Sequence, residues 1–215
     1  HSIREDWRYQ YNVATRNRIR AVDYLLQTSP SLVVFFKKKP KIYNNACEEM
    51  TKLKGHSNPK YRKIDDIRYQ LKSINSLLNY IHTCDEPADL FRSLGLYFDD
   101  IERIDLLDDI KLMGNVWQNL NKVVTTLYDT YEKSNFNYLK TVNVLKKLLY
   151  KFSTDQQKYL EEICNNPILL SSKQWDYLYN ILVVEKPGVL SRWETNILLT
   201  SSVKVSIENK NAIIN

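Results

Sequence analysis

The scarcity of glycine is the property that most limits what this chain can fold into. Only four glycines occur among 215 residues, and no Asn-Gly or Asp-Gly pair is present. Tight β-hairpins favour such pairs because their turns require positive φ angles, and phosphate-binding loops need glycines in clusters. Leu, Ile, Lys, Asn and Tyr are abundant instead. The sequence therefore predicts an all-α protein, an irregular bundle of about ten helices joined by short links.

Apolar residues recur at helical spacing along most of the chain. The longer predicted helices cover residues 3–27, 40–55, 97–112, 115–133 and 135–152. Shorter helices are expected over 87–94, from Ser153, from Ser172 and near Leu190. In the helix over 97–112, the side chains expected to face inward are Ile101, Ile104, Leu106 or Leu107, and Ile110.

Two segments are ambiguous between helix and extended chain. Residues 31–38 contain the run Leu-Val-Val-Phe-Phe, which has strand propensity but no obvious pairing partner, so we predict a short buried helix. Residues 201–215 alternate apolar and polar side chains at Val203, Val205 and Ile207. That segment is expected to form either one extended strand or a loose tail.

The stretch RKIDDIRYQLKSINSLLNYI, residues 62–81, carries apolar residues at alternating spacings of three and four. Such spacing is typical of a helix, and over several heptads it marks a coiled-coil seam. The stretch spans fewer heptads than a secure coiled-coil seam, and Leu77 widens the row of apolar side chains, called the apolar stripe below. We therefore predict a helix that packs on the protein's own core, with a seam for a partner chain as the alternative.

No fixed-period repeat and no low-complexity linker divides the chain. The best place for a division is near residues 80–87. It would separate a basic helical lobe, residues 1–84, from a second helical lobe, residues 85–200, with residues 201–215 as a tail. One continuous domain is the alternative.

Charge is distributed unevenly. Residues 1–75 hold 16 Lys and Arg against 7 Asp and Glu, whereas residues 76–111 hold 3 against 9. An uneven charge distribution is informative about partners rather than about fold. Basic side chains gathered on one surface would release counterions from a nucleic-acid backbone. The candidate polyanion-binding residues are Arg16, Arg18, Arg20, Lys37, Lys38, Lys39, Lys41, Lys60, Arg62 and Lys63. The simpler interpretation is a solvated surface.

The acidic segment lacks the glycine and the ligand spacing of a calcium-binding loop. Its interleaved Ile and Leu indicate one face of an amphipathic helix instead. Three interpretations remain open: a solvated face, a docking surface for the chain's own basic half, and a docking surface for a basic partner. Aromatic side chains also anchor interfaces when they are exposed. The candidate partner-docking residues are Asp99, Asp100, Glu102, Asp105, Asp109, Trp117, Trp175 and Trp193.

No motif for catalysis, cofactor binding or metal binding stands out. GxSxG and HExxH are absent, and the widely spaced Cys47, Cys84 and Cys164 contain no C-x-x-C pair. Reduced thiols predict an intracellular protein of the nucleus or cytoplasm. No apolar run approaches the roughly 20 residues of a membrane span. We therefore expect no enzyme, no cofactor, no metal and no membrane span.

The composition and charge together favour a non-catalytic interaction or scaffold module that binds a protein partner in a larger assembly. The alternative is a helical module that binds DNA or RNA through the basic N-terminal half. The two differ in salt dependence, because phosphate contacts weaken steeply as salt rises and apolar contacts do not.

Overall fold

The computed structural model describes residues 15–36, 45–112, 117–130, 134, 136–165 and 169–204. Within these ranges the chain forms ten α-helices, three short 3-10 or π segments and no strand. The prediction of an all-α protein with about ten helices is confirmed for this part of the chain. The α-helices are α3 (Arg16–Leu26), α4 (Ala46–Lys54), α5 (Ile67–Gln70), α6 (Pro87–Tyr97), α7 (Asp100–Leu112), α8 (Trp117–Thr130), α9 (Tyr138–Leu148), α10 (Thr154–Asn165), α11 (Ser172–Tyr179) and α12 (Arg192–Ser202).

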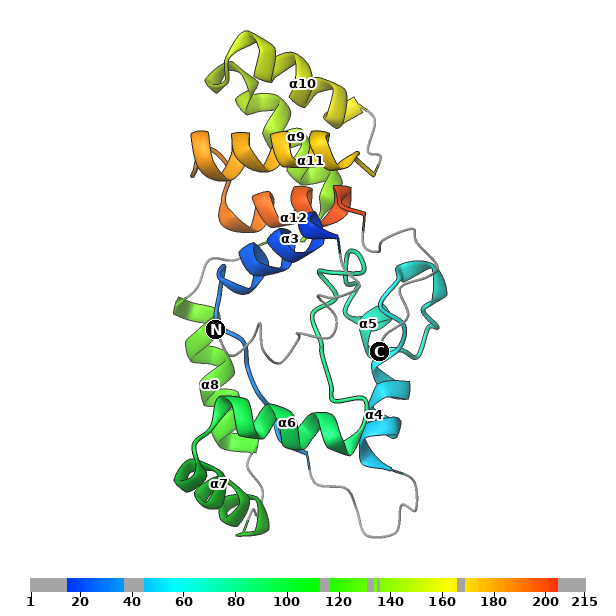
Figure 1. Ribbon diagram of the computed structural model, residues 1–215, viewed down its shortest axis with the longest axis vertical. Coiled ribbons are helices and arrows are strands. Elements are labelled where there is room, and N and C mark those ends of the chain that lie inside the picture. The colour runs from blue at the N-terminus through cyan, green and yellow to red at the C-terminus, as the bar shows by residue number, and fades with distance from the viewer. Residues whose placement is uncertain are drawn as a thin grey trace.

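The hydrophobic core lies in one half of an elongated molecule. Helices α10, α9, α11, α12 and α3 follow one another down the upper half of Figure 1. More than half of the buried apolar side chains come from these helices, and others come from the segments that join them; Trp175, Leu145 and Ile197 are fully inaccessible to water. Residues near both ends of the described chain therefore share one core. The predicted division near residues 80–87 stays a prediction.

Side-chain caps explain where several of these helices begin. Ser191 and Glu194 form a reciprocal capping box at the start of α12. Ser171 and Gln174 do the same for α11, so the N-cap is one residue earlier than the predicted Ser172. Ser153 and Gln156 bond reciprocally before α10, which confirms a predicted start.

Helix α11 continues into a π-helical turn, η3 (Asn180–Glu185), before the chain reverses at Pro187 and Gly188. Both carboxylate oxygens of Glu185 accept hydrogen bonds at this turn, from the amides of Gln156 (2.6 Å) and Asn180 (2.5 Å). Gly188 has a φ of 83°, a conformation that favours glycine. The turn is closed by a hydrogen bond from the Val189 N–H to the carbonyl of Lys186, at 3.4 Å.

The lower half of the molecule has much less apolar burial. It contains α4, α6, α7 and α8, with α5 in the loops above them (Figure 1). Between residues 45 and 112 the buried apolar side chains are Leu77, Leu78 and Leu94, whereas Lys54, Asp66 and Arg68 are also buried there. This half is therefore held largely by polar contacts.

The predicted long helix over residues 62–81 is wrong. Only Ile67–Gln70 is helical, and residues 72–81 form bends and extended chain. Ser73, Asn75 and Ser76 weaken a helix because their side chains compete for backbone groups. Asn75 does so here, since its Oδ1 accepts from the backbone of Leu77 (2.9 Å) and Leu78 (2.8 Å). The apolar stripe of residues 62–81 therefore forms neither a continuous core helix nor a coiled-coil seam.

Two further expectations are also wrong. Residues 31–36 are not helical and are largely exposed, with Phe36 68% exposed. Phe35 instead packs its ring 6.4 Å from that of Phe98, before α7. In α7 itself, Ile101 and Ile104 face outward, while Leu106 and Ile110 are half-buried. Residues 37–44 lie outside the described residues.

Other boundaries are shifted by a few residues. Helix α4 ends at Gly55 as predicted, where a Cβ would collide with the Asp66 carboxylate. Helix α6 continues through Gly95 to Tyr97 rather than ending before it. At the C-terminal end Ser201 and Ser202 belong to α12, and residues 205–215 lie outside the described residues.

Candidate functional site

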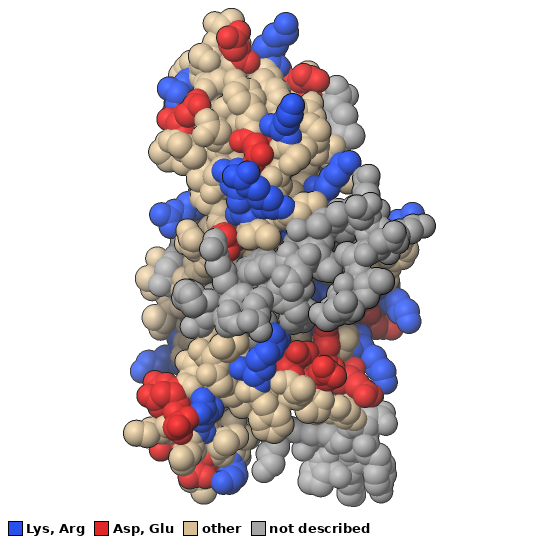
Figure 2. Space-filling view, viewed as in Figure 1, with Lys and Arg blue, Asp and Glu red and all other residues tan. Residues whose placement is uncertain are grey.

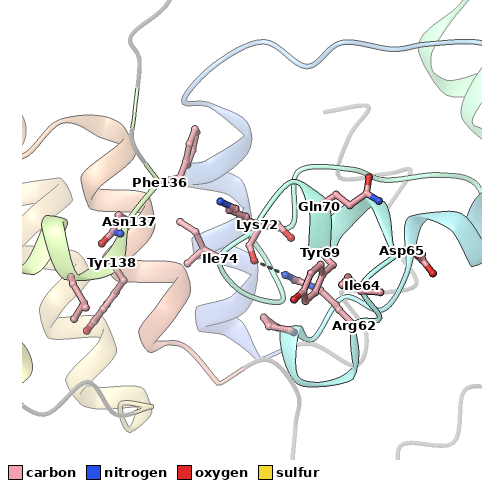
Figure 3. A pocket seen from close by; sticks show the side chains of 13 residues that line it. Arg62, Ile64, Asp65, Tyr69, Gln70, Lys72, Ile74, Phe136, Asn137 and Tyr138 are labelled. Carbon is pink, nitrogen blue, oxygen red and sulfur yellow. Dashed lines mark hydrogen bonds between the residues drawn. The ribbon is translucent and has the colours of Figure 1, made fainter.

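An open groove lies between two parts of the chain that are distant in sequence. It has a volume of about 780 Å³. One wall is formed by the loops around α5 and the other by the start of α9 (Figure 3). The lining residues are Pro59, Arg62, Ile64, Asp65, Tyr69, Gln70, Lys72, Ser73, Ile74, Phe136, Asn137, Tyr138 and Leu139. The groove is open to solvent along its length, unlike the enclosed clefts that bury most of a small ligand.

Arg62 shapes the α5 wall of the groove. Its guanidinium donates to four backbone carbonyls, those of His56 (3.1 Å), Ser57 (2.5 Å), Ser73 (2.5 Å) and Asn75 (3.0 Å). The planar five-donor group of arginine suits such a cluster. The side chain thereby ties the loop before α5 to the loop after it.

Arg68, within α5, holds the same region from the other side. Its side chain is buried and donates to the carbonyls of Gly55 (2.8 Å) and Ile81 (2.7 Å). The two arginines replace an apolar core with charge-assisted hydrogen bonds to backbone oxygens. The groove wall is consequently fixed with only the single turn of α5 as regular secondary structure.

Three non-glycine residues with positive φ lie at or beside the groove. They are Lys72 (54°), Phe136 (46°) and Tyr80 (65°). Lys72 and Phe136 line the groove, and the ring of Tyr80 packs 5.1 Å from that of Phe136. Residues held in this conformation cost free energy and cluster at ligand-binding positions. No other non-glycine residue of the described chain has positive φ.

A row of three contacting aromatic rings connects the groove with α12. Phe136 packs between Tyr80 and Trp193, with ring centroids 5.1 and 5.0 Å apart. Burial raises the pKa of the Tyr80 hydroxyl to about 12, against the opposing charge of Arg62. Tyr80 is therefore neutral at physiological pH, and its ring supports Phe136 by direct packing.

The apolar side chains of the groove are unusually exposed. Ile64 and Leu139 are each 70% exposed, and Tyr69 is 48% exposed. Lys72 and Asp65 are also exposed and have no ion-pair partner among the described residues. The groove thus offers apolar surface together with one free charge of each sign.

Sequence reasoning missed this site because it assigned these apolar residues to buried stripes. No sequence signal marks Leu139 as exposed. The polar residues at 73, 75 and 76 were a usable signal, since they argue against a continuous helix through the α5 region.

The described candidate polyanion-binding residues belong to two segments, α3 and the loop before α5. Arg20 donates to Asp176 at 2.5 Å and stacks 3.9 Å from the Tyr179 ring centroid, so it stabilises the core. The guanidinium of Arg62 already donates hydrogen bonds to backbone carbonyls. Arg16 and Arg18 lie on α3, whereas Lys60 and Lys63 are exposed before α5. Lys37, Lys38, Lys39 and Lys41 lie outside the described residues.

The predicted acidic residues lie at the start of α7 and along its outer side. Asp99 and Glu102 cap the helix reciprocally, and Asp100 pairs with Arg103. Asp105 and Asp109 are exposed and have no ion-pair partner among the described residues. These two remain available to a partner.

The three candidate tryptophans differ in exposure. Trp175 is fully buried and donates from Nε1 to the carbonyl of Leu199 at 3.0 Å, so it belongs to the core rather than to a surface pocket. Trp193 is half-buried against Phe136. The side chain of Trp117 lies outside the described residues.

A second polar contact joins α4 to the segment before α6. Lys54 Nζ lies 2.9 Å from Asp85 Oδ1, which also accepts from Thr51 Oγ1 at 2.9 Å. Burial alone would raise the pKa of the Asp85 carboxyl, but the hydrogen bonds from Lys54 and Thr51 reverse this effect and hold its pKa below the ordinary value.

Comparisons with known proteins give no relative: no family model, curated protein or solved structure matches this chain. Within the described residues, no group of three or more His, Cys, Asp or Glu is arranged to hold a metal ion. No described helix is both long and apolar enough to span a membrane.

Proposed function

We propose that this protein is a non-catalytic interaction module whose α7 helix docks a basic, amphipathic segment of a partner protein. The observation that carries the proposal is the outward face of α7. That face combines uncovered apolar side chains with unpaired carboxylates.

The outward face of α7 carries several exposed aliphatic side chains. Leu112, Ile101 and Ile104 are 82, 72 and 60% exposed, and no residue of α7 is buried. Exposed apolar residues placed together mark interaction sites more often than isolated ones do. Burying one such side chain stabilises a complex by about 1.5–3 kcal/mol before the costs of association.

The opposite side of α7 is apolar as well. Leu106 and Ile110 are half-buried on the side that carries Arg103. Arg103 donates to the carbonyl of Phe98 (2.9 Å), which connects the helix to the end of α6. A helix with apolar residues on both sides is typically covered on both sides. Within the described part of the chain, the side of α7 that carries Ile101 and Ile104 stays exposed.

The charges on α7 indicate the sign of charge that the partner segment should have. Helix α7 holds five acidic residues against two basic ones, and both basic residues already pair within the helix, Arg103 with Asp100 and Lys111 with Asp108. Figure 2 shows acidic side chains among tan surface at the end of the molecule that α7 forms. Asp105 and Asp109 are left to attract cations, which favours a basic partner over an acidic one.

Two labelled peptides of opposite charge test the proposal. One has Leu on one face of a helix and Lys on the other, and its match carries Glu in place of Lys. In fluorescence anisotropy titrations, the Leu/Lys peptide should bind the protein at least tenfold more tightly than the Leu/Glu peptide. Equal binding of the two, or tighter binding of the Leu/Glu peptide, would contradict the proposal.

Charge reversal on α7 locates the site. The double variant Asp105→Lys with Asp109→Lys should weaken binding of the Leu/Lys peptide at least tenfold. Glu161→Lys with Glu162→Lys makes the same change in net charge on α10, whose two glutamates are exposed. If both double variants weaken binding equally, the attraction is a property of net charge and not of α7.

Nucleic-acid binding is the second candidate function. The ammonium groups of Lys60, Lys63 and Lys72 are exposed beside the groove, near Tyr61 and Tyr69, which are 59 and 48% exposed. Aromatic side chains within a basic groove can stack the bases of a single strand. Binding of a labelled single-stranded oligonucleotide that falls steeply between low and moderate salt would support this function.

A further inference from the structure

We infer that the partner of α7 is a second copy of this chain, whose groove beside α5 receives the outward face of the helix. The inference rests on the proposed function, because it names the partner that this face binds. The basic, amphipathic segment is then residues 59–72, which form the α5 wall of the groove. Each copy offers one helix and one groove, so the copies join head to tail.

Three apolar and two acidic side chains of α7 share one face of the helix. Ile101, Ile104, Asp105, Asp108 and Leu112 recur at intervals that return to the same side after each turn or two. All five are exposed. Helices that insert into grooves of other proteins are recognised by anchors at this spacing. The outward face of α7 therefore has the pattern of a helix that docks in a groove.

The groove carries apolar surface that matches this face. Ile64 lines it from the α5 side and Leu139 from the start of α9, and Figure 3 shows these two walls. Both side chains are 70% exposed, and Tyr69 beside Ile64 is 48% exposed. An inserted row of aliphatic side chains would remove this surface from water together with its own.

Cations outnumber carboxylates around the groove. Lys72 lines it, and Lys60, Lys63 and Lys140 are chain neighbours of lining residues. All four are exposed, and the salt bridges among the described residues include none of them. Asp65 is the one carboxylate among the lining residues. The rim of the groove therefore attracts an acidic helix such as α7.

A copy does not fill its own groove with its own α7. Arg103 donates to the carbonyl of Phe98 and holds α7 at the end of α6. Figure 1 shows α7 at the lower end of the molecule, whereas α5 lies near the boundary with the upper half. Only another copy can bring the two surfaces together. A contact between two different surfaces of identical chains is heterologous, and it continues into a ring or a filament.

Both surfaces are formed before they meet. Arg62 fixes the loops on either side of α5 through the carbonyls of Ser57 and Ser73. Asp99 and Glu102 cap the start of α7 reciprocally. Surfaces that are already ordered lose little conformational freedom on association, which favours binding.

Sedimentation velocity of the full chain tests the inference. The average mass of the unaltered protein should rise above that of a monomer between low and high micromolar concentration. Added salt should lower it again, because the charges at the contact become screened. Val184→Ser, at a position 59% exposed on η3, should associate like the unaltered protein. An unaltered protein that stays monomeric throughout would overturn the inference.

Two variants that each lose one surface test the head-to-tail arrangement. Asp105→Lys with Asp109→Lys removes the acidic charge of α7, and Ile64→Ser with Leu139→Ser removes the apolar wall of the groove. All four positions are exposed, and circular dichroism checks that the helices remain. Each variant alone should be monomeric. Their equimolar mixture should form a dimer with one copy of each, because the intact groove of the first receives the intact α7 of the second.

Two results of this mixing experiment would refute the arrangement. One is a mixture that stays monomeric. The other is a groove variant that associates with itself as strongly as the unaltered protein does, since α7 would then bind a different surface.

The Leu/Lys peptide separates this inference from the proposed function. Its binding is measured on the groove variant, whose α7 is uncovered. Tight binding, with an unaltered protein that never self-associates, would leave the proposed function in place and refute the second copy as partner. Loss of both peptide binding and self-association would refute both. A monomeric protein whose groove binds a single-stranded oligonucleotide would assign the groove to nucleic acid and would also overturn the inference.

Discussion

Lys54 and Asp85 form an ion pair of 2.9 Å in which the cation is buried and the carboxylate is mostly exposed, with 9 and 62% of the two side chains accessible. Lys54 lies in the last turn of α4, and Asp85 lies one residue before Glu86, the N-cap of α6, so the pair connects these two helices. It lies in the half of the molecule that has few buried apolar side chains. Polar contacts such as this ion pair therefore contribute much of the packing between α4 and α6 in that half.

Asp85→Asn should lower the free energy of unfolding by about 1–3 kcal/mol, because the buried ammonium of Lys54 loses its counter-charge. Urea denaturation followed by circular dichroism measures the change. Glu86→Gln removes a neighbouring carboxylate that makes no side-chain cap bond, so it should change stability by less than about 0.5 kcal/mol. Equal effects of the two substitutions would show that the pair is not stabilising.

Acid should weaken the same contact. Because the pKa of Asp85 is held below its ordinary value of 3.8, its contribution to stability is complete above that pH. The contribution is lost as the pH falls through the lower pKa of the folded protein. Below pH 3.8 the urea midpoint of the unaltered protein should therefore fall more than that of Asp85→Asn. Parallel pH profiles would contradict the lowered pKa.

Alkaline pH should act through Tyr80. Its pKa is raised to about 12 by burial, so the unfolded chain releases this proton first, near pH 10. Stability should consequently decrease between pH 10 and about 12. Tyr80→Phe should reduce that loss, whereas Tyr150→Phe, at a side chain 73% exposed, should not. Urea midpoints at pH 9 and pH 11 measure the difference.

Arg62→Met should loosen the loops on both sides of α5, since four carbonyls lose their donor. Amide hydrogen exchange between residues 56 and 75 should accelerate at least tenfold. Arg62→Lys should not restore protection, because an ammonium cannot reproduce the planar arrangement of donors. Lys63→Met is the matched control at an exposed cation, and it should leave exchange unchanged.

Local signals in the sequence predicted the helical class and many helix ends. A capping residue such as Ser153 acts within three or four residues, so its effect is visible in the sequence. These features depend on backbone conformations that a short segment determines by itself.

The errors arose where long-range contacts decide the structure. The spacing of residues 62–81 is compatible with a helix, but Arg62 and Arg68 bond to carbonyls up to 13 residues away and fix loops instead. No spacing rule anticipates such bonds. The outward orientation of Ile101 and Ile104 was hidden for another reason: apolar residues occur on both sides of α7, so the sequence does not identify the covered side.

The apolar part of the α7 face can be tested apart from its charge. At moderate salt, where charge attraction is screened, Ile101→Ser with Ile104→Ser should weaken binding of the Leu/Lys peptide at least tenfold relative to the unaltered protein, as measured by anisotropy. Val184→Ser should bind like the unaltered protein. If the α7 double variant also binds as tightly as the unaltered protein, α7 is not the docking surface.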